Sequence, residues 1–213
     1  MTICIAMPAR FVRFLPALLL PIVAACAQPG SVRSAGSAEG PVTVGIIAIN
    51  DFHGSLEPPR LSVPTPDGKG GLVPVPAGGA AWLASAVDTV RSGYAFSLTV
   101  SAGDLISASQ LSSSIYLDEP SIGVANRIGL DFNAVGNHEF DRGRAELLRM
   151  QNGGCDKHTP REPCAVEPFK GASFKFLAAS TLTENGQPLF PPYAVRSFGK
   201  GDRQVKVAVI GLT

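Results

Sequence analysis

The alternation of apolar and polar residues divides most of the chain into short strands and amphipathic helices. Runs rich in β-branched residues predict strands, and they lie at Val42–Asn50, Ser97–Asp104, Phe132–Asn137, Phe174–Thr183 and Gln204–Thr213. The first run is almost continuously apolar, which is typical of a strand covered on both faces. A further strand over Tyr193–Phe198 is followed by a Gly-Lys-Gly-Asp turn and is predicted to pair with the last run as a hairpin.

Helical spacing occurs between these strands. Residues 79–91 carry apolar side chains at the i, i+3, i+4 and i+7 positions, namely Leu83, Ala86, Val87 and Val90. Glu119–Ile128 and Asp141–Met150 are predicted to be helical as well, the latter with Asp141 as a plausible N-cap. Strands that alternate with helices favour an α/β layered domain.

Residues 55–78 break this pattern, because they are crowded with proline and glycine. A loop of that length is usually functional or disordered. We expect an irregular surface excursion near the rim of the site described below.

The N-terminus has the pattern of an export signal. Residues 1–25 place Arg10 and Arg13 before an apolar run that is short and interrupted by proline, which does not suit a membrane span. The run ends in Val-Ala-Ala-Cys and resembles the bacterial lipobox, in which Cys26 is lipidated and begins the mature protein. A plain secretory signal and a helix of the mature protein are the alternatives.

Residues 26–41 are small, polar and rich in glycine and serine, so they predict a flexible tether. Together with the signal, this tether predicts an exported protein of the periplasm or cell envelope, anchored to the membrane through lipid. The formal net charge of the 213 residues is +1, which gives no broad electrostatic footprint for nucleic acid, so no polymeric nucleic-acid partner is expected.

Three polar motifs each follow a predicted strand. They are Asn-Asp-Phe-His-Gly at 50–54, Gly-Asp-Leu at 103–105 and Gly-Asn-His-Glu-Phe-Asp at 136–141. Ligand sites in layered α/β sheets gather at the carboxyl ends of strands, so these motifs are predicted to lie close together.

The residue types in these motifs suit a divalent transition metal. Asp51 and His53 are two residues apart and share one side of an extended strand end. Taken singly, each motif also has a structural explanation: a turn with a surface histidine for the first, an ordinary strand end for the second and a polar loop for the third.

Taken in order, the three motifs resemble the metallophosphoesterase signature, and the stretches around them are similar to bacterial 5′-nucleotidases over roughly residues 42–213. The resemblance implies an α/β fold, an αββα sandwich of mixed sheets flanked by helices. The implied activity is the metal-dependent hydrolysis of phosphate esters, with a nucleotide or other phosphomonoester as substrate. A sulfur-compound hydrolase of the same superfamily and a non-catalytic truncated lipoprotein are the alternatives.

The resemblance also implies two divalent metal ions, with manganese, zinc, cobalt and iron as candidates. By position, Asp51 and His53 bind the first metal, Asp104 bridges both metals and Asn137 binds the second. His138 would then face the substrate phosphate. Two catalytic residues are thus expected, His138 and Asp141, the second orienting the first, although Asp141 alone also reads as a helix N-cap.

The family pattern needs further histidines, including a Gly-His-x-His element downstream. This chain contains only three histidines, and none follows His158. The family's C-terminal nucleotide-binding domain has no counterpart here either. We therefore expect an incomplete and inactive fragment, which a truncated gene product, a split gene or a deliberate fragment would each explain.

Cys155 and Cys164 are separated by eight residues. In an exported protein this spacing predicts a disulfide. A zinc site that uses His158 as a third ligand is the alternative.

Overall fold

The computed structural model describes residues 40–213. The predicted signal at 1–25 and nearly all of the predicted tether at 26–41, including Cys26, lie outside the described residues. Within the described part, no helix has the length and apolar character needed to cross a membrane.

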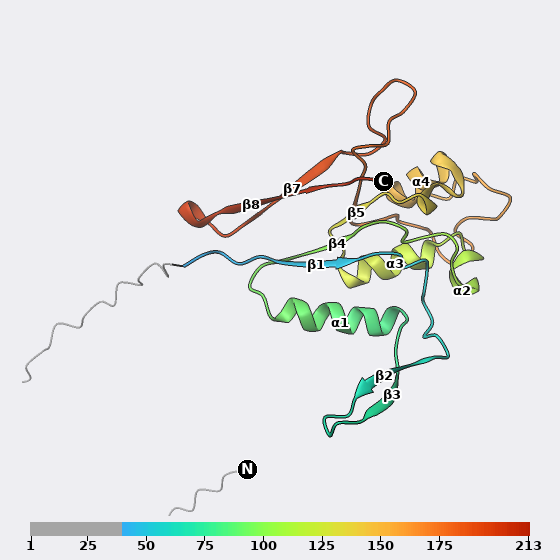
Figure 1. The fold of residues 1–213 in the computed structure, drawn as a ribbon. Coiled ribbons are helices and arrows are strands. Elements are labelled where there is room, and N and C mark those ends of the chain that lie inside the picture. Colours follow the sequence, from blue (N-terminus) through green and yellow to red (C-terminus); the bar gives the residue numbers. More distant parts are fainter. Residues whose placement is uncertain (1–39) are drawn as a thin grey trace, which may run out of the picture. The chain divides into compact units, whose positions relative to one another are not determined.

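A four-stranded parallel sheet forms the centre of the fold (Figure 1). Its order is β1 (Gly45–Ile49), β4 (Ser97–Ser101), β5 (Phe132–Ala134) and β6 (Lys175–Leu177). Each strand was predicted, and each is shorter than the apolar run that predicted it. The polar motifs lie beyond the last residue of β1, β4 and β5, so they form loops at the carboxyl edge of the sheet.

The connecting helices pack on one face of this sheet. The strands follow one another in one direction across the sheet, and right-handed crossovers then place their helices on the same side. These helices are α1 (Ala80–Ser92), the short α2 (Leu111–Ser114), α3 (Glu119–Ile128) and α4 (Gly143–Asn152). Ile47 of β1 is buried there against Val87 and Ile128.

The predicted helices are confirmed, except for the start of the last one. Asp141 was expected to cap it, but the N-cap position of α4 belongs to Arg142. The reason is a 3-10 turn, η1 (His138–Phe140), which comes first and leaves the Asp141 carboxylate hydrogen-bonded to His138 instead.

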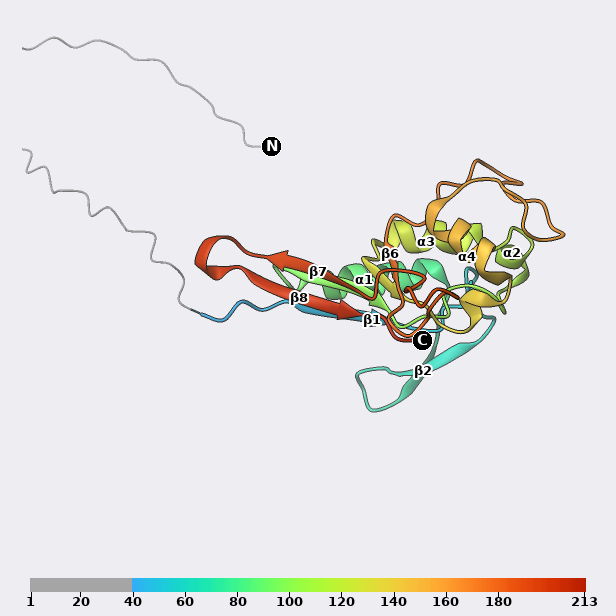
Figure 2. The same cartoon turned by 90° about the horizontal axis from the view of Figure 1, so that it is seen from above.

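The other face of the sheet is covered by an antiparallel hairpin of β7 (Tyr193–Phe198) and β8 (Val205–Ile210), joined through the 3-10 turn η2 (Gly201–Arg203). Its apolar side chains pack on Leu98, Phe132 and Leu177 from β4, β5 and β6. Figure 2 shows the hairpin lying over the sheet from a second direction. The predicted hairpin is confirmed, and it adds the beginning of a second β layer to the helical layer and the sheet.

The prediction of an irregular surface excursion at 55–78 is half right: the segment is exposed, but it is not irregular, because it contains a hairpin of β2 (Ser62–Pro66) and β3 (Leu72–Pro76). Asp67 stabilises its turn by accepting hydrogen bonds from the backbone N–H groups of Lys69 and Gly71. All four prolines of the two strands fall in the same alternate pairs of the ladder. Proline lacks an N–H, so it is tolerated in pairs that exchange no hydrogen bonds.

The predicted disulfide is confirmed. Cys155 and Cys164 are bonded, with their Cα atoms 5.5 Å apart, and the zinc alternative is wrong because both sulfur atoms are used. The closed loop is tied to two helices through Glu119, whose Oε1 accepts from the Cys164 N–H at 3.0 Å and from Arg149 Nη1 at 2.7 Å.

Removing this disulfide should lower the free energy of unfolding. Because the bridge closes a short loop, the chain-entropy relation gives a loss of about 2–3 kcal/mol for Cys155→Ser with Cys164→Ser. Urea unfolding followed by circular dichroism measures the difference. Reductant should shift the wild-type midpoint to that of the double variant and leave the variant unchanged; coincident midpoints without reductant would contradict a stabilising bridge.

Candidate metal centre

Three loops meet at the carboxyl edge of the sheet. The loop after β1 runs alongside the loop after β4, and hydrogen bonds join their backbones: Asp51 N–H to Gly103 O at 3.2 Å, His53 N–H to Asp104 O at 3.0 Å, and Gly54 N–H to Leu105 O at 3.1 Å. The loop after β5 is the third. The structure therefore brings the three predicted motifs together, as parallel strand order requires.

The backbone is strained at three predicted site residues. Asp51, His53 and Asp104 have φ angles of 49°, 46° and 54°, in the left-handed region that residues with a Cβ rarely adopt. Such conformations persist where the surroundings impose them, and they cluster at functional sites. Here the backbone hydrogen bonds between the two loops impose them.

Glycine allows the loops after β4 and β5 to approach closely. A Cβ on Gly136 would lie 2.2 Å from Asp104 Oδ1, and a Cβ on Gly103 would lie 2.7 Å from the Gly136 nitrogen. Both distances are shorter than any van der Waals contact. The glycines before Asp104 and before Asn137 are therefore needed to place the two motifs against each other.

A buried carboxylate fastens the same two loops. Glu139 is almost completely buried and accepts backbone N–H groups from Asp104 at 2.9 Å, Leu105 at 2.8 Å and Gly136 at 2.7 Å. Burial raises the pKa of Glu139, and the three N–H donors oppose that rise. Glu139 therefore has a structural role, because it holds the two loops together.

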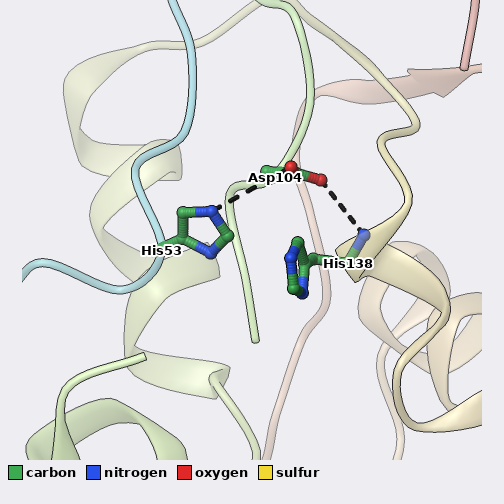
Figure 3. Close-up of side chains that lie close together, drawn as sticks. All are labelled: His53, Asp104 and His138. Atoms are coloured by element: carbon green, nitrogen blue, oxygen red, sulfur yellow. Dashed lines mark hydrogen bonds and ion pairs between the residues drawn. The ribbon is translucent and has the colours of Figure 1, made fainter. Parts of the chain in front are cut away.

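His53, Asp104 and His138 form a cluster whose potential ligand atoms all lie within 4.8 Å of one another (Figure 3). His53 Nε2 is 4.0 Å from Asp104 Oδ2 and 3.9 Å from Asp51 Oδ1. The other oxygen of Asp104 accepts the His138 backbone N–H at 3.1 Å. Asp104 therefore turns one oxygen toward the ring of His53 and is fixed through the other oxygen by the backbone of His138.

The tautomer of His53 follows from its second nitrogen. His53 Nδ1 is 2.8 Å from the carbonyl oxygen of Ser107. A carbonyl only accepts hydrogen bonds, so Nδ1 carries the proton and the lone pair of the neutral ring is on Nε2. That lone pair is on the side of Asp51 and Asp104. This donor set of imidazole nitrogen and carboxylate oxygen fits a divalent transition metal.

His138 is held by Asp141, as predicted. Its Nδ1 is 2.8 Å from Asp141 Oδ2, so Nε2 is the ring nitrogen that Asp141 does not contact. The hydrogen bond to Asp141 raises the pKa of His138 above its ordinary value, more than its partial burial lowers it. The rings of His53 and His138 meet edge to face with centroids 4.8 Å apart.

Asn137 is exposed and immediately precedes His138 at the start of η1. Asp51 is also largely exposed, and Asn50 donates a hydrogen bond to its Oδ2. Their assignment as metal ligands stays a prediction.

Sequence reasoning missed the residues behind His53. Ser107, Asp118 and Arg142 form a hydrogen-bonded group there, with Asp118 fully buried. Asp118 carried one signal, an acidic residue directly before a predicted helix. That signal predicts an N-cap, but the Asp118 side chain makes no capping bond.

Known proteins resemble this chain over most of its length. No family model matches it. An uncharacterized protein from the 5′ region of pqq-V in Acinetobacter calcoaceticus is 48% identical over 162 residues, which are 74% of this chain and 79% of that protein. Protein UshA of Salmonella pullorum is 36% identical over 132 residues, which are 60% of this chain and 20% of UshA.

A solved structure agrees with these relatives. The 5′-nucleotidase precursor from Thermus thermophilus aligns with a TM-score of 0.54 and 28% identity over 78% of this chain and 28% of that one. The chain thus spans most of the Acinetobacter protein, but only 20% of UshA and 28% of the Thermus thermophilus protein.

Replacing Asp141 by asparagine should lower the pKa of His138 toward the ordinary histidine value of about 6.5, because the amide keeps a hydrogen-bond acceptor but removes the negative charge. The raised pKa means that the ion pair stabilises the fold at low pH and that this contribution is lost as pH rises through the folded-state pKa. NMR titration of the His138 ring in the metal-free chain measures the shift.

The exposed His158 is the internal control, and its resonances should be the same in both proteins. An unchanged His138 titration curve in Asp141→Asn would show that Asp141 does not set the charge of that ring.

Proposed function

The chain belongs to the 5′-nucleotidase type of the calcineurin-like metallophosphoesterases and corresponds to their N-terminal part, and on this basis we propose that its metal centre hydrolyses nucleotide phosphomonoesters. The observation that carries the proposal is the clustering of His53, Asp104 and His138, with ligand atoms within 4.8 Å of one another, at the ends of adjacent parallel strands. Phosphoester hydrolysis needs positive charge next to the phosphoryl oxygens, and this cluster has the ligands to hold it.

The ligands divide into two sets. Asp51, His53 and Asp104 would hold the first divalent metal, and Asp104 with Asn137 would contribute to the second. Bound metals would supply positive charge for the phosphoryl oxygens and activate the attacking water. The strained backbone of Asp51, His53 and Asp104 supports this assignment, because it turns three potential ligands toward one edge of the sheet.

His138 would act on the phosphate itself. Asp141 holds Nδ1 of its ring and favours the protonated form, so Nε2–H is available as a donor. A protonated imidazole next to the phosphate stabilises negative charge in the transition state and can give its proton to the leaving oxygen. Asp141 orients the ring and balances its charge.

The substrate class and the cellular location are proposed on grounds other than the geometry of the metal centre. A nucleoside monophosphate is proposed because of the 5′-nucleotidase relationship, and export because of the signal pattern at residues 1–25. Lipid attachment at Cys26 stays a prediction. Mass spectrometry of the mature N-terminal peptide tests it, and an unmodified N-terminus elsewhere would contradict it.

We also propose that residues 1–213 alone bind metal weakly and hydrolyse phosphate esters at near background rate. Asp104 and Asn137 offer a shared carboxylate and a neutral amide, which is a poor site for a second metal. Among the described residues, the structure has no other cluster of metal-ligating side chains. Adding the downstream half of a relative, in cis or as a second chain, should therefore be needed for turnover.

Two substitutions test the roles of the ligands by metal stoichiometry. Asp104→Ala should abolish binding of manganese, because it removes a ligand common to both metals. His138→Ala should leave metal content nearly unchanged and, in a complemented protein, lower phosphate release from a nucleoside monophosphate by about 10²-fold or more.

Isothermal titration of Mn²⁺ measures affinity, and phosphate release measures turnover. Loss of Mn²⁺ binding in His138→Ala would make His138 a ligand and refute its assignment to the phosphate. Two tightly bound metals and fast turnover in residues 1–213 alone would refute the division of ligands.

A further inference from the structure

A buried ionic group lies directly behind His53. It consists of Ser107 in the loop after β4, Asp118 before α3 and Arg142 before α4, and we call it the Asp118 group. None of these residues belongs to the metal centre as proposed. The group joins three segments that are far apart in sequence, so it forms only when the fold around the centre is complete.

Asp118 is the hub of this group. Its side chain is completely buried, and its carboxylate accepts the Ser107 backbone N–H at 2.9 Å, the Ser113 hydroxyl at 2.7 Å and a short hydrogen bond from Arg142 Nη1. Burial alone would raise the pKa of Asp118, but the hydrogen bonds from Ser113, Ser109 and Arg142 lower it below its ordinary value, so the carboxylate is ionised.

Ser107 connects Asp118 to His53. Its N–H is held by Asp118, its hydroxyl is 3.4 Å from Arg142 Nη1, and its carbonyl accepts from His53 Nδ1 at 2.8 Å. Ser107 is buried and has a φ of 66°, a conformation that a serine leaves readily unless its neighbours hold it. The direction of the carbonyl that fixes the His53 tautomer therefore depends on the bond from Asp118.

Arg142 connects the same group to His138. It directly follows Asp141, which holds the His138 ring, and it occupies the junction between η1 and α4. Its bond to Asp118 thereby fixes the junction relative to the loop that carries Ser107. The Asp118–Arg142 ion pair therefore holds two segments in place: the loop with Ser107, which contacts His53, and the junction next to Asp141, which contacts His138.

We propose that the Asp118–Arg142 ion pair is a positioning device for the metal centre, which sets the Nδ1–H tautomer of His53 through the carbonyl of Ser107. The proposal rests on the proposed function for its purpose, but its structural consequence is measurable without metal. A buried ion pair is by itself weak support for stability, because desolvation offsets much of its attraction. If the pair holds His53 in place, its loss should change the His53 tautomer. A loss of stability alone would not produce that change.

The test compares Asp118→Asn and Arg142→Gln with the wild-type chain. Long-range ¹H–¹⁵N NMR of the metal-free protein at about pH 8.5, two units above the ordinary histidine pKa, reports which ring nitrogen of His53 carries the proton. The wild type should show the Nδ1–H form, and both variants should show a substantial Nε2–H population. Mn²⁺ affinity should fall roughly 10-fold, as is typical when the support of a ligand is removed.

Arg144→Gln is the matched control. Arg144 lies on α4, two residues after Arg142, and pairs with Glu184; both side chains are exposed, and the hydrogen bonds of the Arg144 side chain go to Glu184 and not to the Asp118 group. This variant should keep the wild-type tautomer and affinity. Arg142→Lys retains the positive charge beside Asp118, and it should restore most of the Nδ1–H form that Arg142→Gln loses.

Ser113→Ala covers the case in which loss of either charge unfolds the protein. It removes one hydrogen bond from Asp118 Oδ1 and leaves the ion pair in place. The proposal predicts a minor Nε2–H population and a roughly threefold loss of Mn²⁺ affinity. Wild-type tautomer and affinity in all folded variants of Asp118, Arg142 and Ser113 would overturn the proposal.

Failure of the proposed function would look different. If the wild-type chain binds no Mn²⁺ but the tautomer changes as described, the metal assignment is wrong and the positioning role stands. If the chain binds Mn²⁺ and the tautomer never changes, the positioning role is wrong and the metal assignment stands.

Discussion

The buried carboxylate of Glu139 is the interaction on which the arrangement of the centre depends. It accepts three backbone N–H groups, two from the loop after β4 and one from the loop after β5. Without it these donors would be buried and unpaired, at a cost of about 1–3 kcal/mol each. With it the two loops become one unit, and Asp104 and His138 are held at a fixed distance from each other.

The sheet explains why these loops meet. Parallel strands in the order β1, β4, β5 place three successive strand ends side by side, and helices on one face with the β7–β8 hairpin on the other hold the sheet between them. Each of these strand ends carries a polar motif, so the three motifs meet at one edge of the sheet. The backbone strain at Asp51, His53 and Asp104 is concentrated at this edge, where the packing below is able to enforce it.

Much of this was visible in the sequence, and the reason is that local signals agreed with the fold. The strands of the central sheet, three helices, the C-terminal hairpin and the Cys155–Cys164 bridge follow from spacing and composition, whereas the pairing of His138 with Asp141 was expected from the family resemblance. The β2–β3 hairpin was missed because proline suggests a break, whereas the four prolines of the two strands occupy pairs that need no N–H. The Asp118–Arg142 pair could not be predicted, because it joins residues 24 positions apart through tertiary packing.

The most direct measurement of the central claim is anomalous diffraction from crystals of the chain soaked with Mn²⁺. The account predicts a peak within ligand distance of His53 Nε2 and a carboxylate oxygen of each of Asp51 and Asp104, with His138 Nε2 outside the coordination sphere. A peak bound by both His53 and His138, or no peak at the carboxyl edge of the sheet while Mn²⁺ binds elsewhere, would contradict it.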